Sequence, residues 1–341
     1  MKLPGSAAER KVPSAKMPEG AIPTATGADA KPLLGIFLKI ASTLAFFGMV
    51  SALKWVSQDV PITEVVFARN FFGLFPILIM MGMEGSFGYG WKTSRPMVHM
   101  SRAMVGVSAM ACGFIGLKLL PLPDATAIGF AGPLIVVILA ALLLKESVRI
   151  YRWSAVSVGF VGVLITVIPH LGEGQGGNLA NWGVLFSFLG ALLAAFAMIA
   201  VRKLSETERT ATIVLWFTVT STVLAAFTYP LGLVYPEFAW GVPDLFDGLC
   251  LVAVGVFGGL GQILLTHSYR YADASTIAPF DYMNMVWAIC FGFVLFAEVP
   301  TPEVIVGSLI VIAAGIFVIL REHQLGYDRT RARRASTPSK A

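Results

Sequence analysis

Apolar segments of about the length of a membrane span recur along almost the whole chain, separated by short polar connections. A helix needs about 20 predominantly apolar residues to cross the hydrocarbon core of a bilayer. The pattern predicts ten such spans, at 33–55, 62–83, 96–118, 123–144, 152–170, 181–201, 210–230, 247–269, 272–297 and 301–320. The connections are too short to fold separately, so the sequence predicts an all-α polytopic membrane protein.

Composition agrees with lipid as the main solvent. Of the 341 residues, 56% are hydrophobic and only 13% are charged, whereas soluble domains carry roughly 25% charged residues. Cys112, Cys250 and Cys290 all fall inside expected spans, without disulfide or metal-ligand spacing. We therefore interpret them as packing residues and expect neither a metal nor a cofactor.

The two ends of the chain differ from the spans. Residues 1–32 are rich in Pro, Ala, Gly and Lys, and are expected to form a disordered tail. They do not resemble a signal peptide, because no apolar run follows the basic start. Residues 322–341 form a basic tail, which either simply fixes the topology or also contacts anionic lipid headgroups.

Positively charged residues predict the orientation. With the N-terminus in the cytoplasm, the opposite loops contain no Lys or Arg; these loops are 56–61, 119–122, 171–180, 231–246 and 298–300. By the positive-inside rule both tails face the cytoplasm, as expected for a bacterial inner-membrane protein. Lys54 and Lys118 lie at span ends and are expected to snorkel outward. The basic residues are distributed according to the side of the membrane rather than gathered on one binding face. The net charge of +5 therefore does not indicate a protein that binds nucleic acid.

The chain also contains an internal repeat. The segment 124–128 (DATAI) opens the fourth expected span, and 273–277 (DASTI) opens the ninth. Asp124 and Asp273 are interpreted as helix N-caps. The repeats are expected at 33–170 and 181–320, with five spans each. Because five is odd, the second repeat enters the bilayer from the opposite side, which is typical of secondary transporters.

These segments resemble the ten-helix EamA-type members of the drug/metabolite transporter superfamily. The resemblance covers about 33–320 and rests on both repeat openings, on Pro133, Glu146 and Glu298, on Phe67-Ala68-Arg69-Asn70 and on Pro279-Phe280-Asp281-Tyr282. It implies a carrier of small metabolites such as amino acids, vitamins or nucleotide-like compounds. It implies neither a particular substrate nor a direction of transport.

Ionisable residues inside spans are costly in hydrocarbon and are candidates for function. They are Lys39, Arg69, Arg102 and Asp281. At about 1.5 Å per residue, Arg102 lies roughly 9 Å and Asp281 roughly 13 Å from the cytoplasmic edge. An Asp281–Arg102 ion pair is therefore expected, with either a structural or a functional role. Lys39 is interpreted as a snorkelling residue.

The expected substrate-binding residues are Arg69, Arg102, Gln262, Asp281, Tyr282 and Asn284. Three intramembrane cations against one anion favour a substrate with an anionic group. Asp281 is also a candidate carrier of a coupling proton. Glycine-rich stripes in the third and eighth spans are interpreted first as packing surfaces and second as cavity lining.

The predicted function is secondary active transport of a small organic metabolite by alternating access. A membrane-embedded enzyme or a small-molecule sensor is the alternative. No catalytic residues are proposed, because the four histidines His99, His170, His267 and His323 are scattered. The expected partners are the substrate, the lipid bilayer and a coupling proton, with the protein acting as a monomer or homodimer.

Overall fold

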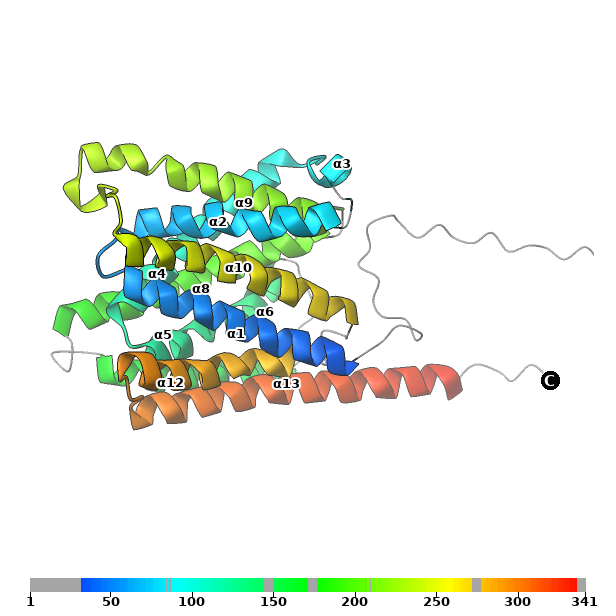
Figure 1. Ribbon diagram of the computed structural model, residues 1–341. Coiled ribbons are helices and arrows are strands. Elements are labelled where there is room, and N and C mark those ends of the chain that lie inside the picture. The colour runs from blue at the N-terminus through cyan, green and yellow to red at the C-terminus, as the bar shows by residue number, and fades with distance from the viewer. Residues whose placement is uncertain are drawn as a thin grey trace, which may run out of the picture.

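The computed structural model describes residues 32–83, 85, 87–143, 150–170, 177–205, 207–208, 210–271 and 277–335. Within these residues every regular element is a helix, and no strand occurs (Figure 1). Three interpretations lie outside them: the disorder of residues 1–31, the position of Glu146 and the capping role of Asp273.

The first half of the chain contains α1 (Pro32–Val56), α2 (Ile62–Met83), α3 (Phe87–Gly90), α4 (Pro96–Leu119), α5 (Leu122–Gly129), α6 (Ala131–Leu143), α7 (Ile150–Val167) and the 3₁₀ helix η1 (Ile168–His170). The second half contains α8 (Gly177–Ser205), α9 (Thr210–Ala226), η2 (Tyr229–Leu233), η3 (Pro236–Phe238), α10 (Leu245–Tyr271), η4 (Ala278–Tyr282), α12 (Met283–Phe296) and α13 (Pro302–Ala335).

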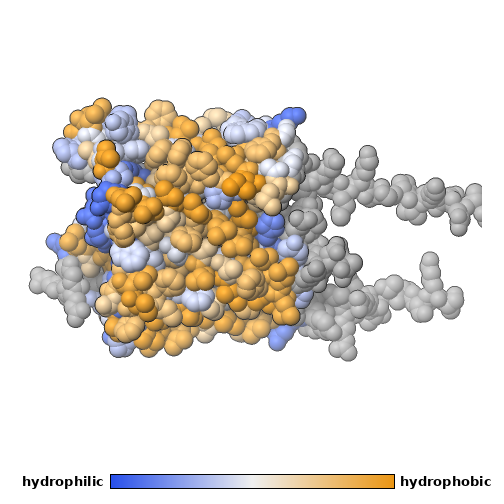
Figure 2. Space-filling model, viewed as in Figure 1, coloured by the Kyte–Doolittle hydropathy of each residue, from blue (hydrophilic) through white to orange (hydrophobic). Residues whose placement is uncertain are grey.

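The length of the apolar segments explains most of these helices. Among the described residues nine helices, counting α5 and α6 together, are long and apolar enough to cross a membrane. The expected ninth span corresponds to a shorter apolar helix, Phe280–Phe296. On the face shown in Figure 2, apolar residues form a broad band across the bundle, and polar ones gather toward its two ends. The protein is thus a polytopic helical membrane protein.

Helix starts follow proline and hydroxyl chemistry. Pro96 opens α4, where the proline's missing N–H costs no hydrogen bond. Thr301 caps α13 by accepting the N–H of Val304 at 3.4 Å. The N-cap interpretation of Asp124 is wrong: α5 starts at Leu122, and Asp124 lies within its first turn. There the carboxylate still faces the positive end of the helix dipole.

Two helices are interrupted within the membrane region. The fourth expected span divides at Phe130 into α5 and α6, next to Pro133, which has no N–H to continue the ladder. The ninth begins with the 3₁₀ turn η4, which contains Pro279, before α12 continues. With Asp124 and Asp273 aligned, Phe130 corresponds to Pro279. The two repeats are therefore interrupted at matching positions.

The helices pack through small residues. The most extensive contacts join α1 with α10, α4 with α8, α7 with α13, and α2 with α10. A Cβ atom on Gly162 would lie 2.7 Å from the backbone oxygen of Gly307, so α7 and α13 approach closely there. A Cβ atom on Gly259 would lie 2.9 Å from the oxygen of Gly73. The packing interpretation of the glycines in α10 is confirmed.

Loop contacts define the two ends of the bundle. At one end, called the Trp55 end, the ring centre of Trp55 in the last turn of α1 lies 6.3 Å from that of Phe246 at the start of α10. At the other, called the Trp91 end, the hydroxyl of Thr93 donates to Glu208 at 2.8 Å. Figure 1 shows the start of α1 and the end of α13 together, on the side where α3 lies.

Candidate functional site

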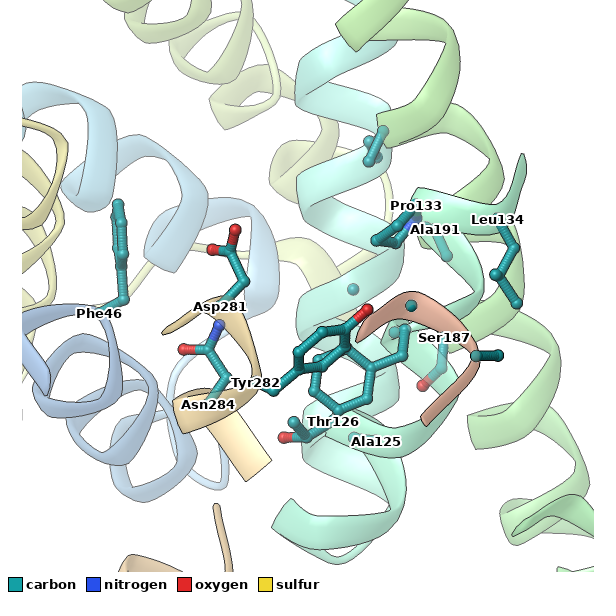
Figure 3. Close-up of a pocket in the computed structure, with 18 of the residues that line it drawn as sticks. Phe46, Ala125, Thr126, Pro133, Leu134, Ser187, Ala191, Asp281, Tyr282 and Asn284 are labelled. Carbon is teal, nitrogen blue, oxygen red and sulfur yellow. The ribbon is translucent and has the colours of Figure 1, made fainter. Parts of the chain in front are cut away.

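A cavity of about 700 Å³ lies inside the bundle. Its volume falls in the range of small-molecule sites, about 300–1,000 Å³. Its walls come from α1, α4, α5, α6, α7, α8, η4, α12 and α13, and most of the lining side chains are apolar. Both interrupted helices contribute to the wall (Figure 3). Interrupted helices often form the binding sites of transporters, because they direct backbone groups into a cavity.

An ion pair provides the charge in this cavity. Asp281 lines the wall and lies 2.5 Å from the ammonium nitrogen of Lys39 on α1. The Lys39 side chain is only 3% exposed, whereas that of Asp281 is 49% exposed. Two interpretations are therefore wrong. Asp281 pairs with Lys39 rather than Arg102, and Lys39 does not snorkel to the membrane surface.

Aromatic and amide groups flank the ion pair. The Tyr282 ring lies 5.6 Å from that of Phe130, so residues from the two interrupted helices meet across the cavity. A Cβ atom on Gly315 of α13 would overlap the Tyr282 hydroxyl, so this glycine leaves room for the ring. Asn284 adds an amide to the wall. In Figure 3, Asp281, Tyr282 and Asn284 lie between Phe46 on one side and Pro133 on the other.

The three remaining predicted residues lie elsewhere. Arg69, Arg102 and Gln262 line a second cavity of about 50 Å³ between α2, α4, α9 and α10. This volume is far below that of a site for a whole metabolite. The six residues expected to form one site are therefore divided between a large cavity with an ion pair and a small one with two arginines.

A second ion pair closes the Trp55 end. The ammonium group of Lys54 contacts the carboxylate of Glu298 and donates to the carbonyl oxygen of Leu120 at 3.0 Å. The same carboxylate accepts the N–H of Leu122 at 2.7 Å. Ala297 adopts a left-handed conformation with a φ of 52°, which turns the chain and positions Glu298. Lys54 is buried in this network, so the expectation that it snorkels is wrong.

Several functional candidates were missed by sequence reasoning. Phe46, Phe130 and Gly315 line the large cavity, yet each resembles an ordinary apolar or small residue of a span. Pro133 and Pro279, each beside the interruption of its own helix, were the available signal for the interrupted helices. The indole N–H of Trp287 donates to the hydroxyl of Thr43 at 3.0 Å and joins α12 to α1.

Comparisons with known proteins agree with this architecture. The model of the EamA-like transporter family matches the chain twice, at residues 33–168 and 181–321. An S-adenosylmethionine uptake transporter of Rickettsia bellii is 31% identical over 79% of this chain and 87% of its own length. A pseudopaline exporter of Pseudomonas aeruginosa is 28% identical over 83% and 94%. A chain of known crystal structure has a TM-score of 0.58 at 18% identity, and the alignment covers 85% of this chain and 98% of that one.

Proposed function

Because the chain belongs to the EamA-like transporter family, we propose that it carries a small polar metabolite across the inner membrane by alternating access. The observation that carries the proposal is the 700 Å³ cavity, with the Lys39–Asp281 pair in its wall. Among the described residues no group of three His, Cys, Asp or Glu side chains could hold a metal.

The internal symmetry favours a rocking carrier. Equivalent helices of two repeats of five would be α1 and α8, α2 and α9, and α4 and α10. The contact of α1 with α10 then has its counterpart in the contact of α4 with α8. The α1–α2 connection lies at the Trp55 end, while Glu208, in the α8–α9 connection, lies at the Trp91 end. Such opposite placement supports ten crossings as inverted repeats, with both tails cytoplasmic.

The two ends of the cavity support one direction of opening. At the Trp55 end, Phe47, Leu122 and Ala288 pack together, and the Lys54–Glu298 pair lies beside them. With the proposed orientation this is the external end. The state described would thus be closed to the outside, and transport would require the Lys54–Glu298 network to separate.

The ion pair suggests the chemistry of the substrate. Lys39 and Asp281 together are electrically neutral, so a bare anion would gain a cation only by displacing the carboxylate. A substrate with both an ammonium and an anionic group would replace each partner with an equivalent one. We therefore propose a zwitterionic metabolite, which retains the predicted anionic group. Names of relatives make S-adenosylmethionine the first compound to test.

Flux into liposomes tests the proposal. Purified protein in liposomes is expected to give saturable uptake and exchange of S-adenosylmethionine, whose amino-acid end is zwitterionic, or of another compound with both an ammonium and an anionic group from a metabolite screen. Removing one partner leaves the other charge uncompensated, so Lys39→Met and Asp281→Asn are each expected to lower kcat/KM at least about tenfold. Lys118→Met is the control, because Lys118 does not line the cavity.

Two results would contradict this function. Binding of hits without saturable flux in the wild-type protein would favour a sensor or an enzyme. Equal flux in the Lys39, Asp281 and Lys118 variants would exclude the ion pair from substrate binding. A pH gradient tests the coupling proton in the same liposomes: if Asp281→Asn keeps the gradient dependence of the wild type, Asp281 does not carry the proton.

A further inference from the structure

The small cavity between α2, α4, α9 and α10 has no place in the transport site described above. It brings together two guanidinium groups, Arg69 from α2 and Arg102 from α4. Arginine remains charged in proteins, and a charge within the membrane region is costly unless it is compensated. The question raised by this cavity is therefore what neutralises two positive charges.

The described residues offer little compensation. Arg69 donates to the amide oxygen of Asn70 at 3.2 Å, and this acceptor is neutral. The guanidinium carbon of Arg102 lies 3.9 Å from the centre of the Phe217 ring, an attraction that offsets only part of a full charge. In the described part of the chain neither arginine forms an ion pair with Asp or Glu.

Arg102 also has unused hydrogen-bonding capacity. Its Nε and Nη1 atoms are buried and have no hydrogen-bond partner among the described residues. Buried donors without acceptors are rare, because each costs about 1–3 kcal/mol. An acceptor that also carries negative charge would satisfy both requirements of Arg102.

The volume of the cavity limits the size of the acceptor that the arginines could bind. A volume of about 50 Å³ exceeds the 10–15 Å³ needed for one water and is too small for a whole metabolite. Gly73, Gly258 and Gly259 line it, and a Cβ atom on Gly258 would lie 3.5 Å from the Nε of Arg69. Gly258 thus leaves space beside the guanidinium of Arg69, and the cavity volume suits a single small ion beside the two cations.

We propose that Arg69 and Arg102 bind one small monovalent anion, of the size of chloride, inside the membrane region and apart from the substrate cavity. The anion offsets one of the two positive charges and accepts the unused N–H groups of Arg102. It also joins α2 to α4 across a cavity that α9 and α10 complete. A carboxylate end of a substrate shares this chemistry, and the experiment separates the two sources.

Thermal unfolding of the purified protein in detergent, without substrate, tests the proposal. Sodium gluconate is replaced by sodium chloride at constant ionic strength, because gluconate is too large for the cavity. Chloride is expected to raise the Tm by roughly 2–4 °C, since an ion that binds only the folded state stabilises it. The rise should saturate with chloride concentration and disappear in Arg69→Gln and in Arg102→Gln.

Arg95→Gln is the matched control. Arg95 lies two turns before Arg102, immediately before α4, and is exposed, so this variant should keep the full chloride effect. If a glutamine variant does not fold, Arg102→Lys replaces it. Lysine keeps the charge but loses the planar fork, so half of the Tm rise should then require a higher chloride concentration.

Three outcomes would overturn the proposal. The first is an equal Tm in gluconate and chloride, and the second is a chloride effect that persists in both arginine variants. The third is stabilisation by formate but not by chloride, which would assign the arginines to a carboxylate group of the substrate. None of these depends on flux, so failure here leaves the transport proposal unaffected.

Discussion

The contact between Tyr282 and Gly315 determines where an aromatic ring lies in the large cavity. The ring is held between Phe130 and the backbone of α13. Gly315→Ala would place a methyl group on the Tyr282 hydroxyl, and we expect the ring to move into the cavity. We predict a KM increased roughly three- to tenfold, equivalent to about 0.7–1.4 kcal/mol, with little change in Tm.

Gly129→Ala is the control for this substitution. Gly129 also lines the cavity, but a Cβ atom added there would meet nothing within 4 Å. Uptake kinetics of both variants in liposomes, together with their Tm values, make the comparison. If the alanine at position 129 raises KM as much as that at 315, loss of cavity volume rather than displacement of Tyr282 is the cause.

The sequence limited where a charge lies along its helix, whereas it did not determine the neighbours of that charge. The rise of about 1.5 Å per residue predicted only that Asp281 lies within its expected span. It gave no information on which helix faces Asp281, and the expected partner Arg102 proved wrong. Lys39 was available as an alternative in the sequence, but the choice depends on the packing of α1 against η4 and α12.

At the scale of elements, one ion pair connects four pieces of the chain. Lys54 lies in the last turn of α1, Leu120 follows α4, Leu122 begins α5, and Glu298 lies between α12 and α13. Because the carbonyl of Leu120 accepts and the N–H of Leu122 donates, the two charges are not interchangeable. We predict that Lys54→Met costs about 2 kcal/mol, since it leaves a largely buried carboxylate without its cation.

The charge-reversed double variant provides the decisive test. Lys54→Glu with Glu298→Lys restores an ion pair but directs a carboxylate at the Leu120 carbonyl and an ammonium at the Leu122 N–H. Its Tm is expected to stay at least as low as that of Lys54→Met. Lys118→Met is the control, because Lys118 lies in the last turn of α4, just before Leu120. This variant should change the free energy of unfolding by less than about 0.5 kcal/mol. Recovery to the wild-type Tm would mean that the ion pair acts without the backbone contacts.

The lengths of the spans were predictable because hydrocarbon imposes one requirement on every segment. The expected 62–83 and 96–118 nearly coincide with α2 and α4. The interruptions at Phe130 and in η4 were not expected, because a single interrupted turn scarcely changes the apolar content of a span. For the same reason Asp124 was given a capping position that Pro121 occupies. Local backbone geometry, rather than hydropathy, determines these details.

At the scale of the whole molecule, the two cavities divide the intramembrane charges. The large one contains a neutral pair beside aromatic and amide groups, and the small one contains two arginines. Aligning Asp124 with Asp273 pairs Arg69 with Thr218, and both line the small cavity. In this alignment the two counterpart positions meet in the small cavity with different chemistry, an arginine in the first half of the chain and a threonine in the second.

The same alignment predicts the sidedness of two loops. Gln58, between α1 and α2, corresponds to Thr207, between α8 and α9, and both are exposed. If the repeats are inverted, these two residues face opposite sides of the membrane. In a variant whose three cysteines are replaced by serine, Gln58→Cys should react with a membrane-impermeant maleimide on intact cells. Thr207→Cys should react only after the cells are permeabilised.

Each result of this labelling has one meaning for the architecture. Reaction of both residues from outside would require parallel repeats and an even number of crossings between them, and would remove the basis for a rocking mechanism. The opposite pattern, with Thr207→Cys outside, would keep the inversion but reverse the orientation given by the basic residues. Glu208 beside Thr207 contacts Thr93 and Ser94, so Ser94→Cys must label together with Thr207→Cys, which provides an internal check.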